Sequence, residues 1–291
     1  MAKGIKELRL RIRSIKNTKK ITRAMEMVSA AKLRRAQNEM AGAKPFQKKL
    51  EILLGRLSRS PKAQANPLFQ ARTDINKPNL LVIVTSDRGL CGAFNANIIK
   101  RAAKYLQEFP DAYVYFIGRK GRDYFQKRLP KDQILGSYVD FQAKLDGAKS
   151  DEIALMLQSK FRNGEVRSID LVCAEFVSTS TNRPQLSRYL PLEASAFGFD
   201  AENSQAIDYI LEPSPEAIFE ALLPRYLRMR IYLAIAENLT CEHSSRMLAM
   251  NNATKNCNEL AAKFTLEMNK ARQAAITTEL TEIIAGADAL N

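Results

Sequence analysis

The residues with the clearest chemical potential follow a short apolar run, Leu80 to Thr85, in the segment Asp87-Arg88-Gly89-Leu90-Cys91-Gly92. A loop between a strand and a helix is where α/β proteins often bind phosphates or hold a nucleophile. The two glycines stand three residues apart, which fits neither the dinucleotide-binding pattern nor the P-loop. A nucleophile elbow centred on Cys91 would need a glycine where Ala93 stands. We therefore interpret the segment as a tight turn whose glycines serve the backbone.

The other candidates for chemistry are isolated from one another. Catalysis by Cys91 would require a histidine as general base. The only histidine, His243, falls within a long helical pattern. A single histidine without further convergent donors does not predict a metal site. The segment Gly118-Arg119-Lys120-Gly121-Arg122 could hold a phosphate, but a turn with solvated charges is the commoner explanation. We predict a non-catalytic protein without cofactor or metal.

The cysteines indicate structural thiols. Cys91, Cys173, Cys241 and Cys257 are far apart and form no CxxC pair. Free cysteines are commonly buried as small apolar residues. No uninterrupted apolar stretch approaches the ~20 residues that a membrane-spanning helix needs, and the amino terminus lacks a secretory segment. We therefore expect reduced, buried thiols in a protein that is not integral to a membrane.

The net charge of +14 is concentrated at one end of the chain. Residues 1–60 hold 17 lysines and arginines against four acids, whereas residues 61–291 hold 28 against 27. A basic arm of this kind suits an acidic partner, which could be nucleic acid, anionic lipid or an acidic protein surface. DNA binding in the manner of a basic zipper is the alternative function. It is disfavoured because the cations are interleaved with an apolar stripe from Lys6 to Arg35 and do not precede it.

Helical periodicity dominates both ends of the sequence. From Ile5 to Leu57 apolar residues recur at steps of three and four, with Pro45 as the one strong breaker and one shift of register. This stripe includes Ile21, Met25 and Val28, which we assign to the core of a coiled coil. After Ser214, placed as the helix N-cap, and Pro215 the chain is again helical nearly to its end. Two long amphipathic helices that cannot bury their stripes alone predict an antiparallel coiled coil.

The centre of the chain has a different texture. A continuous apolar run at Leu80–Thr85, strand-like segments at 112–117 and 169–177, and helix-like segments at 93–107 and 151–161 alternate, which predicts βαβ units on a mainly parallel sheet. Residues 185–190 indicate an edge strand. The fold class is therefore α/β plus long helices: an antiparallel coiled coil with a central Rossmann-like domain. The expected divisions are a first helix at 1–60, a connector at 61–78, the α/β domain at 79–200, and the second helix with its lead-in at 201–291.

Three motifs resemble those of ATP synthase gamma subunits of the F type. Ser14 to Arg35, SIKNTKKITRAMEMVSAAKLRR, is similar to the opening of that family, and Thr85 to Asn95, TSDRGLCGAFN, to its central motif. Ala271 to Ala287, ARQAAITTELTEIIAGA, looks like its carboxy-terminal signature. The resemblance covers essentially the whole chain. It implies a central rotor shaft that couples ion-driven ring rotation to ATP synthesis or hydrolysis at the beta subunits, with no catalytic residue of its own.

The resemblance also implies partners for particular residues. Met25 resembles the position near an acidic loop of beta, and Arg272 with Gln273 the pair in a lower catch against beta. Tyr209 and Glu212 resemble residues that touch the membrane c-ring, and the nearby α/β face suits the epsilon subunit. The implied contacts with beta are Met25, Arg246, Arg272, Gln273, Thr277, Glu279 and Glu282. Each also has a plain structural interpretation, as coiled-coil core for Met25 and as a solvated face for Glu279 and Glu282.

The resemblance carries expectations about place and regulation. No CxxxxxC insertion of the photosynthetic members is present, so thiol control of rotation is not expected. A start at Met1 without a transit-like extension favours a bacterial subunit. We expect a protein peripheral to the cell membrane, on its cytoplasmic face, bound to alpha, beta and epsilon subunits and to the ring, and without nucleic acid.

Overall fold

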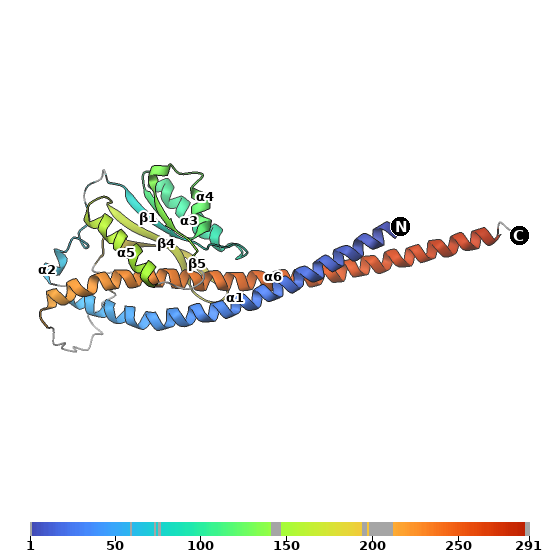
Figure 1. The fold of residues 1–291 in the computed structure, drawn as a ribbon, viewed down its shortest axis with the longest axis horizontal. Helices are drawn as coiled ribbons and strands as arrows, with labels where there is room; N and C mark the ends of the chain where they lie inside the picture. Colours follow the sequence, from blue (N-terminus) through green and yellow to red (C-terminus); the bar gives the residue numbers. More distant parts are fainter. Residues whose placement is uncertain are drawn as a thin grey trace. The chain divides into compact units, whose positions relative to one another are not determined.

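The structure is a computed structural model that describes residues 2–58, 60–72, 74, 77–140, 147–193, 197 and 212–288. The chain forms two compact units. The terminal unit comprises Met1–Ala30 with Arg246–Asn291, and the central unit comprises Ala31–Ser245. Helices α1 (Ala2–Leu57) and α6 (Pro215–Asp288) each contribute to both units (Figure 1).

The sheet of the central unit has five strands in the order β3-β2-β1-β4-β5. Strands β1 (Asn79–Val84), β2 (Tyr113–Ile117), β3 (Ile134–Tyr138) and β4 (Ser168–Phe176) are parallel, and β5 (Asn182–Leu190) runs antiparallel beside β4. Every residue of β1 is buried, because this central strand is covered on both faces. The predicted α/β class is confirmed.

Helices cover the two faces of the sheet, and β1 contributes alternate residues to each. Leu81 and Ile83 pack in the same cluster as α3 (Phe94–Glu108) and α4 (Arg119–Phe125). Leu80 and Val82 pack in the cluster that holds α5 (Gly147–Arg162), α1 and α6. In Figure 1, α6 lies along this second face with α1 beside it. The short helices α2 (Pro61–Gln64) and η1 (Lys131–Gln133) occupy connections.

The long helices follow the predicted pattern. Ser214 accepts a hydrogen bond at its Oγ from the backbone N–H of Ala217, at 3.2 Å, so it caps α6 as expected. Helix α1 continues through Pro45 and α6 through Pro224. In the central unit Lys44 of α1 lies 3.7 Å from Glu237 of α6, and in the terminal unit Thr22 meets Thr254. Partners on α6 step backwards as α1 advances, which makes the pair antiparallel.

A polar seam attaches α6 to the hairpin of β4 and β5. Strand β4 runs on past its last pairing with β1, at Val172, so its later N–H groups need other acceptors. The Oδ1 of Asn238 accepts from the N–H of Ala174 at 3.3 Å, and the Oε1 of Glu237 from that of Phe176 at 3.2 Å. Two further bonds join Asn182 to Ser245, and Ser244 to Thr179. The seam fixes α6 in one register on the hairpin.

Two elements had no clear pattern in the sequence. Strand β3 contains Gly136 and Ser137 and is only partly buried at the edge of the sheet, so it shows no apolar run. Helix α4 has seven residues, most of them charged or polar, and no stripe. The segment from Gly118 to Arg122, interpreted as a turn between a strand and a helix, does connect β2 to α4, but only Gly118 lies outside the helix, since α4 begins at Arg119. Among the residues described, no helix combines the length and apolar character needed to cross a membrane.

Candidate functional site

The buried seam between α1 and α6 in the terminal unit carries hydroxyl groups. Thr22 and Thr254 are each 8% exposed, and their Oγ1 atoms lie 2.8 Å apart. Ser29, which is also buried, donates to the carbonyl of Met25 at 2.7 Å. Hydroxyls with partners can be buried at little cost, but they supply less hydrophobic stabilisation than leucines would. At these positions the helix pair therefore buries little apolar area, although Ile12, Met250 and Cys257 are buried elsewhere in the same unit.

The apolar stripe of α1 in this region faces away from α6. Ile21 is 60% and Val28 is 55% exposed, and Met25 between them is half-buried. Their spacing puts them on one face of the helix, whereas the buried positions are Thr22 and Ser29. The assignment of Ile21 and Val28 to the coiled-coil core is thus wrong, because the pattern reveals an apolar face but not what covers it. Half-buried Met25 is compatible with the core and with a partner contact. An uncovered apolar face suits a partner.

A carboxylate lies beside this stripe. The Nδ2 of Asn251 donates to Glu26 Oε1 at 2.9 Å, and Arg23 donates from the other side at 3.1 Å. The bond from Asn251, followed by the bond and charge of Arg23, lowers the pKa of Glu26 despite some desolvation. Glu26 is therefore held ionised next to Met25.

The distal part of α6 has no buried side chain between Asn258 and Ala285. Large apolar residues stand in solvent: Leu266 is 57%, Leu280 55% and Ile283 68% exposed. A helix with apolar residues exposed in this way normally completes its packing against another chain.

The implied contacts with beta fall mostly on this exposed segment. Arg272 and Glu279 are two turns apart on one face, with Glu282 one turn further on. Gln273 and Thr277 occupy the adjoining face, where the Oγ1 of Thr277 donates to the carbonyl of Gln273 at 3.0 Å. All five side chains are exposed.

Three implied contacts lie in other settings. Arg246 is only 8% exposed, so its side chain is largely covered by the chain itself. Glu212 is exposed just before α6. Tyr209 lies outside the described residues.

The loop after β1 is held by hydrogen bonds to the start of α4, and two of its polar side chains accept these bonds. The Oγ1 of Thr85 accepts from Gly121 N at 2.9 Å, and the Oδ1 of Asp87 accepts from Arg119 N at 3.0 Å. A Cβ atom at Gly118, where φ is +103°, would collide with the carbonyl of Thr85. These contacts tie the loop to the start of α4 and support the interpretation of the motif as structural.

The same loop presents one apolar side chain to solvent, which sequence reasoning missed. Leu90 is 62% exposed and has φ +62°. Left-handed backbone is uncommon for a residue with a Cβ and persists where surrounding contacts impose it. No sequence signal gives this conformation.

The cysteines and the possible metal ligands were the remaining candidates for chemistry. All four cysteines are free and buried. Burial, followed by the charge of Glu237, raises the pKa of Cys173 to about 12, and the same causes raise the pKa of Cys241. Such thiols stay protonated and are poor nucleophiles. Within the described part of the chain, no three His, Cys, Asp or Glu side chains cluster as metal ligands would.

Comparison with known proteins gives a consistent result. The family model described as ATP synthase matches residues 4–290. The ATP synthase gamma chain of Moorella thermoacetica is 42% identical over 287 residues, covering 98% of this chain and 99% of the relative. That of Symbiobacterium thermophilum is 41% identical and covers 100% and 99%, respectively.

Solved structures share the fold. A chain from the Euglena gracilis mitochondrial ATP synthase, in an OSCP/F1/c-ring structure, matches with a TM-score of 0.66 at 20% identity, covering 100% of this chain and 95% of that one. A chain from the central stalk and c-ring of the Tetrahymena thermophila enzyme matches with a TM-score of 0.60 at 23% identity, covering 80% and 99%. With the match over residues 4–290 and the near full-length relatives, this chain belongs to the gamma-chain family of ATP synthases.

Proposed function

We propose that this chain is the central rotor shaft of an F-type ATP synthase, which couples ion-driven rotation of a membrane ring to ATP synthesis or hydrolysis at beta subunits. The observation that carries the proposal is the distal part of α6, where Leu280 and Ile283 stand exposed among charged residues. A helix of this composition is stable in water only as part of a larger assembly. Membership of the gamma-chain family supplies that assembly.

The surfaces of the terminal unit are suited to a cylinder of alpha and beta subunits. The basic arm of residues 1–60, whose first half lies in this unit, would complement acidic loops of beta, and the face of Ile21, Met25 and Val28 would give that contact an apolar centre. Arg272 and Gln273, on adjoining faces of α6, would form the catch against beta. Thr277, Glu279 and Glu282 would transmit force higher on the shaft, together with Arg246.

The central unit is suited to the foot of the rotor. Glu212, with Tyr209, would contact the polar loops of the c-ring, and the α/β domain at 79–200 would bind the epsilon subunit. Exposed Leu90, in the hydrogen-bonded loop after β1, adds an apolar contact point to this unit. We place the protein peripherally on the cytoplasmic face of the cell membrane, with residues 1–60 and 201–291 forming the shaft.

The shaft has no catalytic task of its own in this proposal. In the loop motif, Thr85 and Asp87 form structural hydrogen bonds, and the raised pKa values of Cys173 and Cys241 make these two thiols poor nucleophiles. Rotation would instead change the affinity of each beta site in turn, which is allosteric coupling between discrete states.

The experiment measures ATP hydrolysis by the purified chain, by alpha and beta subunits alone, and by the three together. We expect no turnover by the chain alone and sustained turnover only in the mixture with the chain. Turnover by the pure chain would overturn the non-catalytic assignment. If adding the chain to alpha and beta subunits left the rate of ATP hydrolysis unchanged, the assignment as a rotor shaft would be overturned.

A further inference from the structure

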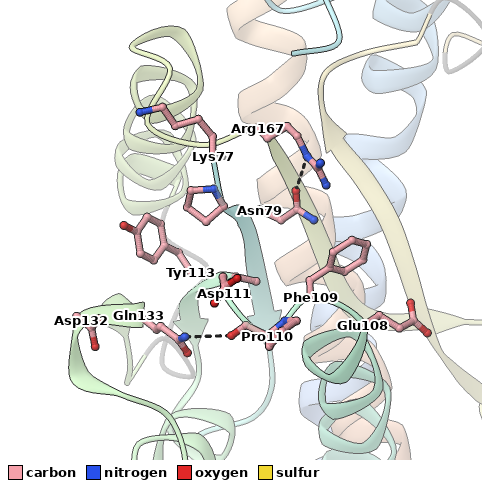
Figure 2. A pocket seen from close by; sticks show the side chains of 12 residues that line it. Lys77, Asn79, Glu108, Phe109, Pro110, Asp111, Tyr113, Asp132, Gln133 and Arg167 are labelled. Atoms are coloured by element: carbon pink, nitrogen blue, oxygen red, sulfur yellow. Dashed lines mark hydrogen bonds between the residues drawn. The ribbon is translucent and has the colours of Figure 1, made fainter. Parts of the chain in front are cut away.

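The amino end of the sheet holds cavities that the rotor proposal leaves unused. One, of about 520 Å³, is lined by residues of both charges, Lys77 and Arg167 with Glu108, Asp111 and Asp132 (Figure 2). A smaller neighbour, of about 230 Å³, shares Asn79 and Arg167 with it. The two cavities differ in charge, and the difference decides what each could bind.

The smaller cavity, called here the arginine cavity, is lined by three arginines. Arg72 comes from the connection before β1, Arg167 directly precedes β4, and Arg188 lies on β5. No carboxylate among the described residues lines it. One carboxylate is bonded to these arginines. Asp170, buried on β4, accepts a hydrogen bond from Arg188 Nε at 2.5 Å and another from the Tyr105 hydroxyl at 2.6 Å. The three arginines and Asp170 together carry a charge of +2.

Several donors of these arginines remain available. Arg167 uses its Nε toward Asn79 Oδ1, at 3.2 Å (Figure 2), and Arg188 uses its Nε toward Asp170. Among the residues that the structure describes, the terminal N–H groups of both have no acceptor. Arg72 donates through Nη2 to the carbonyls of Phe161 and Arg162, while its Nε is buried without an acceptor in the described part of the chain. A buried donor without an acceptor is costly and calls for a ligand or water.

We propose that the arginine cavity binds a phosphate-sized oxyanion, either inorganic phosphate or the phosphate of a larger ligand such as a lipid headgroup. Guanidinium groups form strong, charge-assisted bonds with phosphate oxygens. The three guanidinium groups come from three separate segments of the chain. Such an arrangement suits a tetrahedral phosphate, which accepts hydrogen bonds in several directions, better than a planar carboxylate ligand. The volume lies below the range of roughly 300–1,000 Å³ typical of sites for drug-sized ligands, which fits a small anion.

The test uses the full chain and inorganic phosphate as the probe, at low ionic strength. Calorimetric titration should give saturable binding, and phosphate should raise the midpoint of thermal unfolding, because a ligand that binds the folded state stabilises it. Arg167→Gln should weaken binding by about tenfold or more, as expected for loss of a charge-assisted bond. This variant is mild for the fold, because Asn79 Oδ1 still accepts from the Ser168 hydroxyl at 2.9 Å.

The matched control is Arg183→Gln, which removes the same charge from an exposed position on β5 outside the cavity. It should leave phosphate affinity within about twofold of the wild type, because screening weakens a distant surface charge. Arg167→Lys keeps the charge and should retain part of the binding. Equal losses in the Arg167→Gln and Arg183→Gln variants, or no effect of Arg167→Gln, would overturn the site.

A second arm separates the two sources of phosphate. The chain is mixed with vesicles of phosphatidic acid in phosphatidylcholine and with phosphatidylcholine alone. A lipid headgroup site predicts retention on the acidic vesicles that Arg167→Gln reduces more than Arg183→Gln does. A free-phosphate site predicts calorimetric binding without that difference. Saturable binding in neither arm refutes the proposal and leaves the rotor assignment intact, since that rests on the distal part of α6.

Discussion

The helix pair is built differently in the two units of the chain. In the central unit α1 contributes Leu50 and Leu54, 4% and 0% exposed, to a core shared with Leu227 and Ile231 of α6. In the terminal unit a few apolar side chains, Ile12, Met250 and Cys257, are buried along with the hydroxyl pair of Thr22 and Thr254, while many large apolar residues face solvent. The central unit is therefore stabilised by its own core. The terminal unit keeps its apolar surface for other chains, as a shaft that turns inside a cylinder requires.

The largest expected effect comes from the core of the central unit. Leu54→Ala should lower the free energy of unfolding by about 2–5 kcal/mol, because it removes buried methyl groups and leaves a cavity. Leu266→Ala, at a position 57% exposed on the distal part of α6, should change it by less than about 0.5 kcal/mol. Denaturant unfolding of the full chain measures both. Similar losses would mean that the two regions do not differ as described.

The exposed face of α1 should matter for coupling and hardly at all for folding. Met25→Lys adds a cation beside the proposed acidic loop of beta and should strengthen a contact that must break in each cycle. An added ion pair of about 0.5–1 kcal/mol should slow the step that breaks it about twofold to fivefold. We expect ion pumping per ATP hydrolysed to fall while assembly persists. Met25→Leu, which keeps the apolar face, is the control. Unchanged pumping per ATP in the lysine variant would assign Met25 to the helix pair alone.

The hydroxyl pair of the terminal unit should contribute modestly to stability. Thr22→Val should cost about 1 kcal/mol, since Thr254 keeps its bond to the Met250 carbonyl at 2.8 Å. A double-mutant cycle with Thr254→Val isolates the contact and should give a coupling of about 0.5–1 kcal/mol. Thr265→Val, an exposed threonine with the same type of bond to its own helix, is the control. A coupling near zero would show that the pair does not join the helices.

The smallest effect concerns Glu26. Its pKa in the folded chain lies below the ordinary value of 4.5. Its ionised form therefore contributes stability above that pH, and the contribution is lost as the pH falls through the folded pKa. The stability difference between wild type and Glu26→Gln should shrink by a few tenths of a kcal/mol from about pH 6 to about pH 3. In an Asn251→Ala background this pH dependence should be weaker, because the main cause of the shift is gone. An equal pH dependence in both backgrounds would contradict the role of Asn251.

The sequence predicted elements wherever one local signal was sufficient. The apolar run at Leu80 gave β1, and Ser214 with Pro215 gave the start of α6. Strand β3 was not predicted, because a partly buried edge strand that contains Gly136 shows no apolar run in the sequence. The stripe at Ile21 was found but assigned to the wrong partner, since periodicity cannot say which surface covers a face. The exposure of Leu90 and its left-handed backbone had no sequence signal.

The most direct test of the account is ATP-driven proton pumping by membranes that carry a chain ending at Lys270, measured per assembled complex. This truncation removes Arg272, Gln273, Thr277, Glu279 and Glu282 and leaves the central unit whole. A second truncation, which removes only residues 284–291, is the control and should retain some coupling, because a shaft is held along its length. We predict that the Lys270 form assembles in part and loses most of its pumping. Equal pumping per complex in the full-length and Lys270 forms would show that the exposed distal part of α6 transmits no torque.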